Sequence, residues 1–159
     1  MLSFFANVPV WILPLFLGLL AVGMRATRTR SVPKLLVYSL PFLGLLSLKS
    51  VLSFEAQIAA LSIFALGYQL GAAFGFHRQA SWIAGSTQNR VTIKGEWLTL
   101  TTIMGLFAVN FINGATKGIA PELANGALYA CVFSAIAGLL SGTFIGRAGR
   151  IMTVPTVKI

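Results

Sequence analysis

Five of the polar side chains within the long apolar runs of this sequence are candidates for a site, because a polar group is costly there and can serve a chemical purpose. They are Lys49, Tyr68, Gln69, Asn110 and Asn113. Lys49 is the one formal charge well inside such a run, and ionisable residues in membrane spans are functional hypotheses by default. Lys49 also lies only about five residues, roughly 8 Å, from the outer end of its run, so its ammonium group can instead reach the lipid headgroups. The pattern predicts either a polar site between two helices or a lysine that snorkels.

The other ionisable and nucleophilic side chains weigh against enzyme chemistry. The acids Glu55, Glu96 and Glu122 lie at the ends of apolar runs or in loops, whereas proton-coupled exporters need a carboxylate within the membrane. His77 and Cys131 are the single histidine and the single cysteine, so the chain alone forms neither a multi-histidine metal site nor a disulfide. The sequence therefore predicts no catalytic residues, no metal site and no cofactor.

The composition indicates a protein whose solvent is lipid. Of the 159 residues, 57% are hydrophobic and 9% are charged, whereas soluble domains carry about 25% charged residues. A membrane-spanning helix needs about 20 mostly apolar residues. Five runs qualify, at residues 8–24, 35–54, 57–76, 97–113 and 124–146. We expect residues 1–159 to form a single all-α integral membrane domain, a bundle of five transmembrane helices.

The basic residues predict the orientation of this bundle. Cytoplasmic loops are enriched in Lys and Arg, and ten of the 12 basic residues fall on one side of the expected spans. These are Arg25, Arg28, Arg30, Lys34, Arg78, Arg90, Lys94, Arg147, Arg150 and Lys158. The N-terminus is therefore expected outside and the C-terminus in the cytoplasm. The net charge of +9 does not indicate nucleic-acid binding, because the bases form short clusters between apolar runs.

Some of these basic side chains are predicted to bind anionic lipid headgroups. Lys and Arg clusters directly cytoplasmic of a span attract such lipids electrostatically. The predicted set is Arg25, Arg28, Arg30, Lys34, Arg78, Arg147 and Arg150.

The long cytoplasmic loop, residues 77–96, is expected to contain a β-hairpin. Ser81–Ala84 and Val91–Lys94 can pair across Gly85–Arg90. An isolated two-stranded hairpin is marginal in water, so this one needs the membrane interface or a partner beneath it.

Two helices carry small residues at a spacing of four. They are Gly67, Gly71 and Gly75 in the third run, and Ser134, Gly138, Gly142 and Gly146 in the fifth. Residues four apart share one helix face, and small residues let helix backbones approach closely in lipid. The two flat grooves are predicted either to pack within the bundle or to form the seam of a homodimer.

The sequence also contains a weak internal repeat. Leu43–Phe54 aligns with Met104–Ala115, and each segment is followed by a glycine-grooved run that ends in arginine. The second and third spans thus look like a parallel copy of the fourth and fifth, an arrangement found in several transporter folds.

Taken in order, these features resemble a known group of proteins. An uncharged first run precedes the basic loop Arg25–Arg30, Pro41 interrupts the second run, and Val91–Leu100 precedes a final run that ends IGRAGR. The chain resembles a family of small, uncharacterised five-span bacterial inner-membrane proteins, and is distantly similar to CcdC-like proteins. The resemblance implies a multi-pass protein of the bacterial cytoplasmic (inner) membrane, and it carries over no functional residue.

Two functions are compatible with these patterns. The scarcity of polar groups in the spans and the two grooves favour a non-enzymatic membrane protein that acts by helix packing. It would be a homo-oligomer or an accessory subunit of a larger membrane complex, with lipids as its other partners. The alternative is a small permease or channel with a site between the second and fourth spans, near Lys49 and Asn110.

Overall fold

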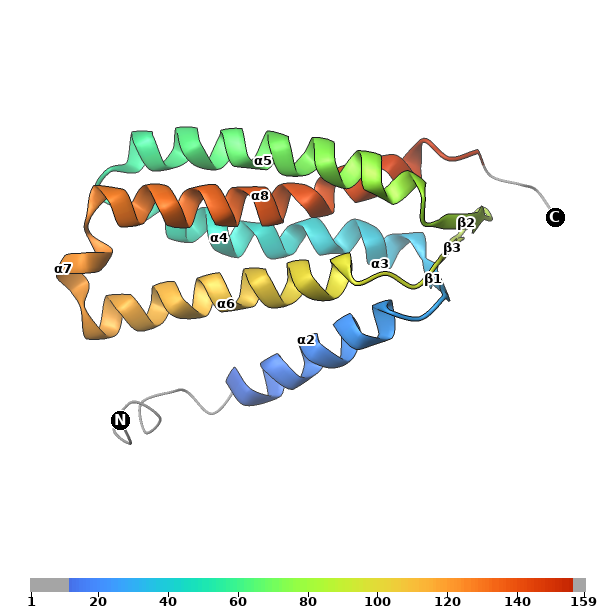
Figure 1. Ribbon diagram of the computed structural model, residues 1–159, viewed down its shortest axis with the longest axis horizontal. Helices are drawn as coiled ribbons and strands as arrows, with labels where there is room; N and C mark the ends of the chain where they lie inside the picture. The colour runs from blue at the N-terminus through green and yellow to red at the C-terminus, as the bar shows by residue number, and fades with distance from the viewer. Residues whose placement is uncertain (1–11, 156–159) are drawn as a thin grey trace.

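The computed structural model describes residues 12–155, most of which lie in long helices that run side by side (Figure 1). In chain order the elements are α2 (Ile12–Ala26), β1 (Arg30–Pro33), α3 (Lys34–Ser39), η1 (Leu40–Phe42), α4 (Leu43–Leu52), α5 (Gln57–Ala80), β2 (Ile83–Ser86), β3 (Arg90–Ile93), α6 (Leu98–Ile119), α7 (Pro121–Ala124) and α8 (Ala127–Met152).

Within residues 12–155, four helical stretches are long and apolar enough to cross a membrane. They are Lys34–Leu52, Gln57–Ala80, Leu98–Ile119 and Ala127–Met152. The described part of the first predicted span is the 15-residue helix α2, and residues 8–11 of that span lie outside the described residues. In the second stretch the helix tightens to the 3₁₀ turn η1 around Pro41, which lacks the backbone donor for a regular α-helical bond.

Three of the helices continue beyond the ends of the predicted spans. α5 continues to Ala80, α6 to Ile119 and α8 to Met152, beyond the expected ends at residues 76, 113 and 146. Polar residues mark the edge of an apolar run without ending a helix, because side chains such as Gln79 and Arg147 find partners inside the protein. Residues 124–146 also begin differently, since Ala124 closes the short helix α7 and α8 starts at Ala127.

α5 and α8 lie against each other along their length and run in the same direction, toward the sheet (Figure 1). A Cβ added at Gly67 would lie 2.8 Å from the carbonyl oxygen of Ala135, and one added at Gly142 would lie 2.8 Å from the carbonyl carbon of Tyr68. The other groove glycines, Gly71, Gly75, Gly138 and Gly146, meet backbone of the facing helix in the same way. The two grooves therefore meet within one chain, and Ser134 is fully buried.

A small antiparallel sheet of three strands closes one end of the bundle. The fold therefore departs from the expected all-α domain. β2 and β3 form the hairpin of the long loop, and β1 adds a third strand from the connection between α2 and α3, in the order β1-β3-β2. The sheet packs through Val91 and Ile93 against Val37 of α3 and Ile151 of α8. This apolar contact supplies the support that an isolated hairpin lacks.

Candidate functional site

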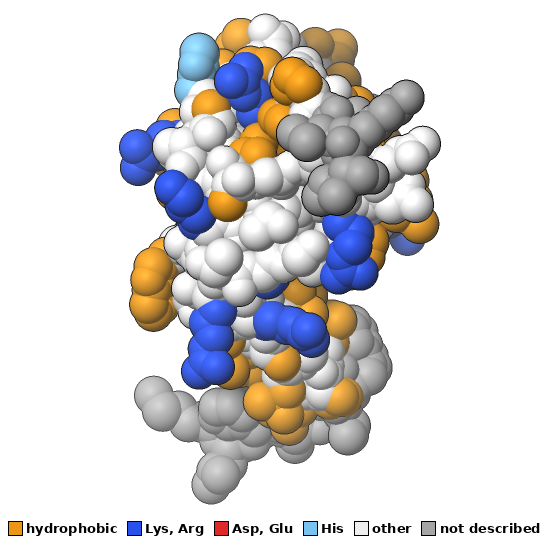
Figure 2. Space-filling view, turned by 90° about the vertical axis from the view of Figure 1, so that its right-hand side faces the viewer, with side chains coloured by type: hydrophobic (Ala, Val, Ile, Leu, Met, Phe, Trp, Pro, Cys, Tyr) orange, Lys and Arg blue, Asp and Glu red, His pale blue; other side chains and the backbone are white. Residues whose placement is uncertain are grey.

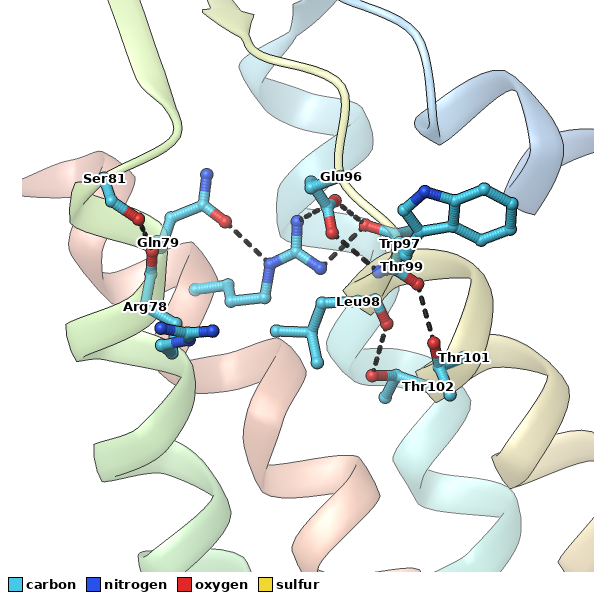
Figure 3. Close-up of polar contacts among 10 residues, drawn as sticks. Arg78, Gln79, Ser81, Glu96, Trp97, Leu98, Thr99, Thr101 and Thr102 are labelled. Carbon is cyan, nitrogen blue, oxygen red and sulfur yellow. Dashed lines mark hydrogen bonds and ion pairs between the residues drawn. The ribbon is translucent and has the colours of Figure 1, made fainter.

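A buried ion pair lies where the bundle meets the sheet. Arg147 Nη2 of α8 donates to Glu96 Oε1 at 2.7 Å, and the two side chains are 5% and 1% exposed. Arg147 Nε donates to Gln79 Oε1 of α5 at 2.7 Å, and Arg147 Nη1 donates to Thr99 Oγ1 of α6 at 2.7 Å. Figure 3 shows Gln79 on one side of the guanidinium, with Glu96 and Thr99 on the other. One arginine thus joins three long helices.

Glu96 is held from several directions. Its Oε2 accepts the backbone N–H of Thr99 at 2.8 Å, and the Thr99 hydroxyl donates to Oε1. A carboxylate in this position also complements the positive N-terminal end of α6. The Glu96 backbone N–H donates to the carbonyl of Ala26 at 3.0 Å, and Gly95 beside it approaches the Thr27 backbone so closely that a Cβ would overlap it. The end of α2 is thereby tied to the start of α6.

The polar atoms of Glu96 and Arg147 are engaged almost entirely with one another and with neighbouring side chains. Both oxygens of Glu96 accept hydrogen bonds from partners inside the protein, and its charge is balanced by Arg147. Within the described residues, the one buried polar atom of this network without a partner is Gln79 Nε2. The arrangement is suited to fixing helices and to removing a negative charge from the surface.

The surface around the sheet is strongly basic (Figure 2). We refer to the sheet and the basic side chains around it as the cap. Its exposed or half-buried members are Arg25, Arg28, Arg30, Lys34, Arg78, Arg90, Lys94 and Arg150. Burial lowers the pKa of Arg30, and the negative charge of Glu96 opposes that effect. Glu96 is the single acid of this end, and it is 3% exposed. The charge that the cap presents to its surroundings is therefore positive.

Arg147 was expected to contact lipid headgroups, and this prediction is wrong. The residue is 4% exposed and its guanidinium is enclosed by Gln79, Glu96 and Thr99. Arg147 lies at the end of an apolar run, where an arginine is usually at the membrane interface. The counter-ion that draws it inward comes from a distant part of the sequence.

The other predicted headgroup ligands keep surface positions. Arg25, Arg28 and Arg78 are exposed, and Arg30, Lys34 and Arg150 are half-buried. Two of them lie over aromatic rings, Arg78 over Trp82 with 5.7 Å to the ring centroid and Arg150 over Phe76 with 5.1 Å. Such contacts hold a guanidinium in place.

The predicted intramembrane polar set does not converge on one site. Asn110 Nδ2 donates to Ser47 Oγ of α4 at 2.8 Å and to the carbonyl of Leu106 at 2.9 Å. Asn113 is 3% exposed, and its Oδ1 has no partner among the described residues. Lys49 is exposed and makes no hydrogen bond to a described residue, a position that permits snorkelling.

Tyr68 and Gln69 lie elsewhere, along a groove between α5 and the η1–α4 stretch. The groove has a volume of about 360 Å³ and is open on one side. Its remaining lining is apolar and comes from Pro41, Gly44, Leu45, Leu48, Leu61, Phe64 and Ala65. Neither Lys49 nor the two asparagines contribute to it.

Sequence reasoning missed three members of the buried network, Gln79, Glu96 and Thr99. One signal was available, because Glu96 is the single acid among ten bases on the same side of the expected spans. Ser47, the partner of Asn110, gave no such signal, since serine is ordinary in a membrane helix.

No protein-family model matches the chain, and comparisons with curated proteins and with solved structures found no match. The resemblance to five-span inner-membrane proteins therefore stays a prediction from the order of sequence features.

Proposed function

We propose that this chain is a five-span protein of the bacterial cytoplasmic membrane, with its N-terminus outside and the cap and C-terminus in the cytoplasm. The first span would include α2. The charge distribution supports this orientation, because the basic residues gather at the sheet end whereas the exposed acids Glu55 and Glu122 lie at the other end. Membership of the family similar to CcdC-like proteins is part of this proposal.

Within that membrane the protein acts by assembly, as a homo-oligomer or an accessory subunit of a larger complex, and its cap binds anionic lipid headgroups. The observation that carries the proposed headgroup binding is the buried pair of Arg147 and Glu96. The pair withdraws the one acid of the cap from the surface, so the exposed ionisable groups there are bases. Each Lys or Arg near an anionic leaflet contributes about 1 kcal/mol of attraction.

A parallel repeat of α4–α5 and α6–α8 is the second element of the proposal. An offset of 71 residues relates Gly67, Gly71 and Gly75 to Gly138, Gly142 and Gly146. The contacts follow the same offset, since Gly71 faces Leu139 whereas Gly142 faces Tyr68. This reciprocity supports two copies of one hairpin related by an axis along the bundle.

The outer helices depart from that symmetry. Gly44 of α4 contacts Ser141, and Gly105 of α6 contacts Leu140, so both helices pack on α8. α8 is consequently the central helix, and α5 keeps one side less covered.

Lipid binding is tested with purified protein in nanodiscs of phosphatidylglycerol or of phosphatidylcholine at low and high salt. We expect a higher melting temperature with the anionic lipid, and this difference should shrink at high salt because screening weakens surface attraction. Replacing Arg28→Glu and Lys94→Glu together should reduce the difference. Lys117→Glu, at the opposite end, is the control. Equal melting temperatures in both lipids would refute headgroup binding.

Assembly and orientation are tested in native membranes. Gently solubilised protein should migrate well above the monomer in native electrophoresis, and a monomer would contradict action by assembly.

In a Cys131→Ser background, Gln88→Cys in the β2–β3 turn should be labelled only after the cytoplasmic face is opened. Labelling from outside would reverse the orientation.

The alternative function, a small permease or channel with a site between α4 and α6, is favoured by one observation. Asn110 and Ser47 bond across these helices, and one helical turn farther along α6 lies Asn113 Oδ1, which has no partner in the described part of the chain. Substrate-dependent uptake into vesicles that is lost in Asn113→Leu would favour this function over assembly.

A further inference from the structure

Gln69 lies exposed near the middle of α5, the least favourable place for an unsatisfied amide. It is roughly 18 Å from the start of the helix and roughly 16 Å from its end, at the α-helical rise. Its side chain is exposed and makes no hydrogen bond to any described residue. In hydrocarbon each unsatisfied polar group costs several kcal/mol, so the amide requires a partner.

The position of Gln69 in the proposed repeat explains why no other helix of the bundle covers its side chain. The offset of 71 residues relates Gln69 to Leu140, and Leu140 fills the contact between α8 and Gly105 of α6, at 3.2 Å from an added Cβ. The corresponding contact between α5 and α4 is not filled. Instead it is the groove of about 360 Å³ that Gln69 and Tyr68 line.

The surface around Gln69 permits a helix to come close. Ala65 and Ala73 lie one turn to either side on the same face, and both are exposed. The opposite face of α5 carries Gly67, Gly71 and Gly75 and is already occupied by α8. A dimer seam through those glycines is therefore excluded, and the Gln69 face is a separate surface.

A second copy of this chain fits that surface by its chemistry. A primary amide is self-complementary, because its NH₂ group donates and its carbonyl oxygen accepts. Two identical chains with the same orientation place Gln69 at the same depth, and a two-fold axis along the membrane normal then pairs the residue with its own copy. A second copy of this chain always has a matching amide at the same membrane depth, whereas a different protein need not have one.

We propose that the α5 face centred on Gln69 is the contact between two copies of this chain, joined by reciprocal hydrogen bonds between the two Gln69 amides. This inference rests on the proposed action by assembly and identifies its surface. The groove beside Gln69 lies where apolar side chains of the partner helix can pack.

The contact is tested by cross-linking in membranes, in a Cys131→Ser background that keeps Gln69. Ala65→Cys and Ala73→Cys lie on the proposed face and should form disulfide-linked dimers on mild oxidation. Leu70→Cys, which is also exposed but turned to another face, is the matched control and should cross-link poorly. Equal cross-linking at the three positions would overturn the proposal.

The role of the amide is tested by Gln69→Leu, a change that suits a lipid-facing position and should preserve the fold and the melting temperature of the monomer. We expect the dimer to dissociate about three- to thirtyfold more readily, the range for interhelical hydrogen bonds in membranes. Leu70→Ala should leave the equilibrium unchanged.

The outcomes separate this inference from the broader proposal. An unchanged equilibrium in Gln69→Leu, with a large native assembly still present, overturns the Gln69 contact and leaves action by assembly intact. A wild-type chain that is monomeric in native membranes overturns both.

Discussion

Replacing Gly142 by alanine tests whether close backbone contact between α5 and α8 stabilises the fold. An added Cβ would overlap the carbonyl oxygen of Tyr68 and lie 2.8 Å from its carbonyl carbon and 2.9 Å from its Cα. Ordinary contact begins at 3.4 Å, so the two backbones must separate by more than about 0.5 Å. The obstacle is backbone, which cannot rotate away as a side chain can.

The expected energy follows from two opposing effects. A radial gap of about 0.5–1 Å forfeits a quarter to a half of each dispersion contact along the seam, and overpacking of a well-packed contact costs about 1–3 kcal/mol. Alanine also favours the helix by about 1 kcal/mol relative to glycine. Because the seam runs the length of both helices, we expect the overpacking to prevail, with a net loss of up to about 2 kcal/mol.

Gly114→Ala is the matched control. Gly114 lies in α6, and an added Cβ there would meet nothing within 4 Å. This variant should be as stable as the wild type or more stable by up to about 1 kcal/mol. The free energy of unfolding is measured by denaturant titration in mild detergent, together with the melting temperature. If Gly142→Ala gained stability as Gly114→Ala does, the close-packing explanation of the glycines would be wrong.

Three further contacts are tested by substitution with the same titration. Arg147→Met alone should cost about 3–5 kcal/mol, because it leaves the Glu96 carboxylate buried without its counter-ion. Adding Glu96→Gln to this variant should recover part of the lost stability. If the losses of the two substitutions were instead additive, a direct pair would be contradicted. Asn110→Leu should cost about 0.6–2 kcal/mol through the lost bond to Ser47, and a neutral result would show that this bond contributes nothing. Lys117→Ala should cost less than about 1 kcal/mol, since the hydrogen bond that Lys117 Nζ donates to Ser53 Oγ at 2.6 Å is at the surface. A larger loss would mean that this end is more rigid than its exposure indicates.

The long helices could be predicted from the sequence because the signal for them is local. A run of about 20 apolar residues has few alternatives to a membrane-spanning helix, and the helices Gln57–Ala80 and Ala127–Met152 each include all or most of such a run. The glycine spacing was equally local, since residues four apart must share a helix face. The sequence therefore identified Gly71 and Gly142 as packing positions without showing what they pack against.

The tertiary structure alone decided which surfaces meet. Arg147 and Glu96 are 51 residues apart, and β1 pairs with β3 from another loop, so no local pattern indicates either contact. The free energy of a buried charge depends on whether a counter-ion reaches it, and that depends on how α5, α6 and α8 come together. For the same reason Arg147, which has the sequence context of an interfacial arginine, lies inside the protein, whereas Gln69, in the middle of an apolar helix, lies on its surface.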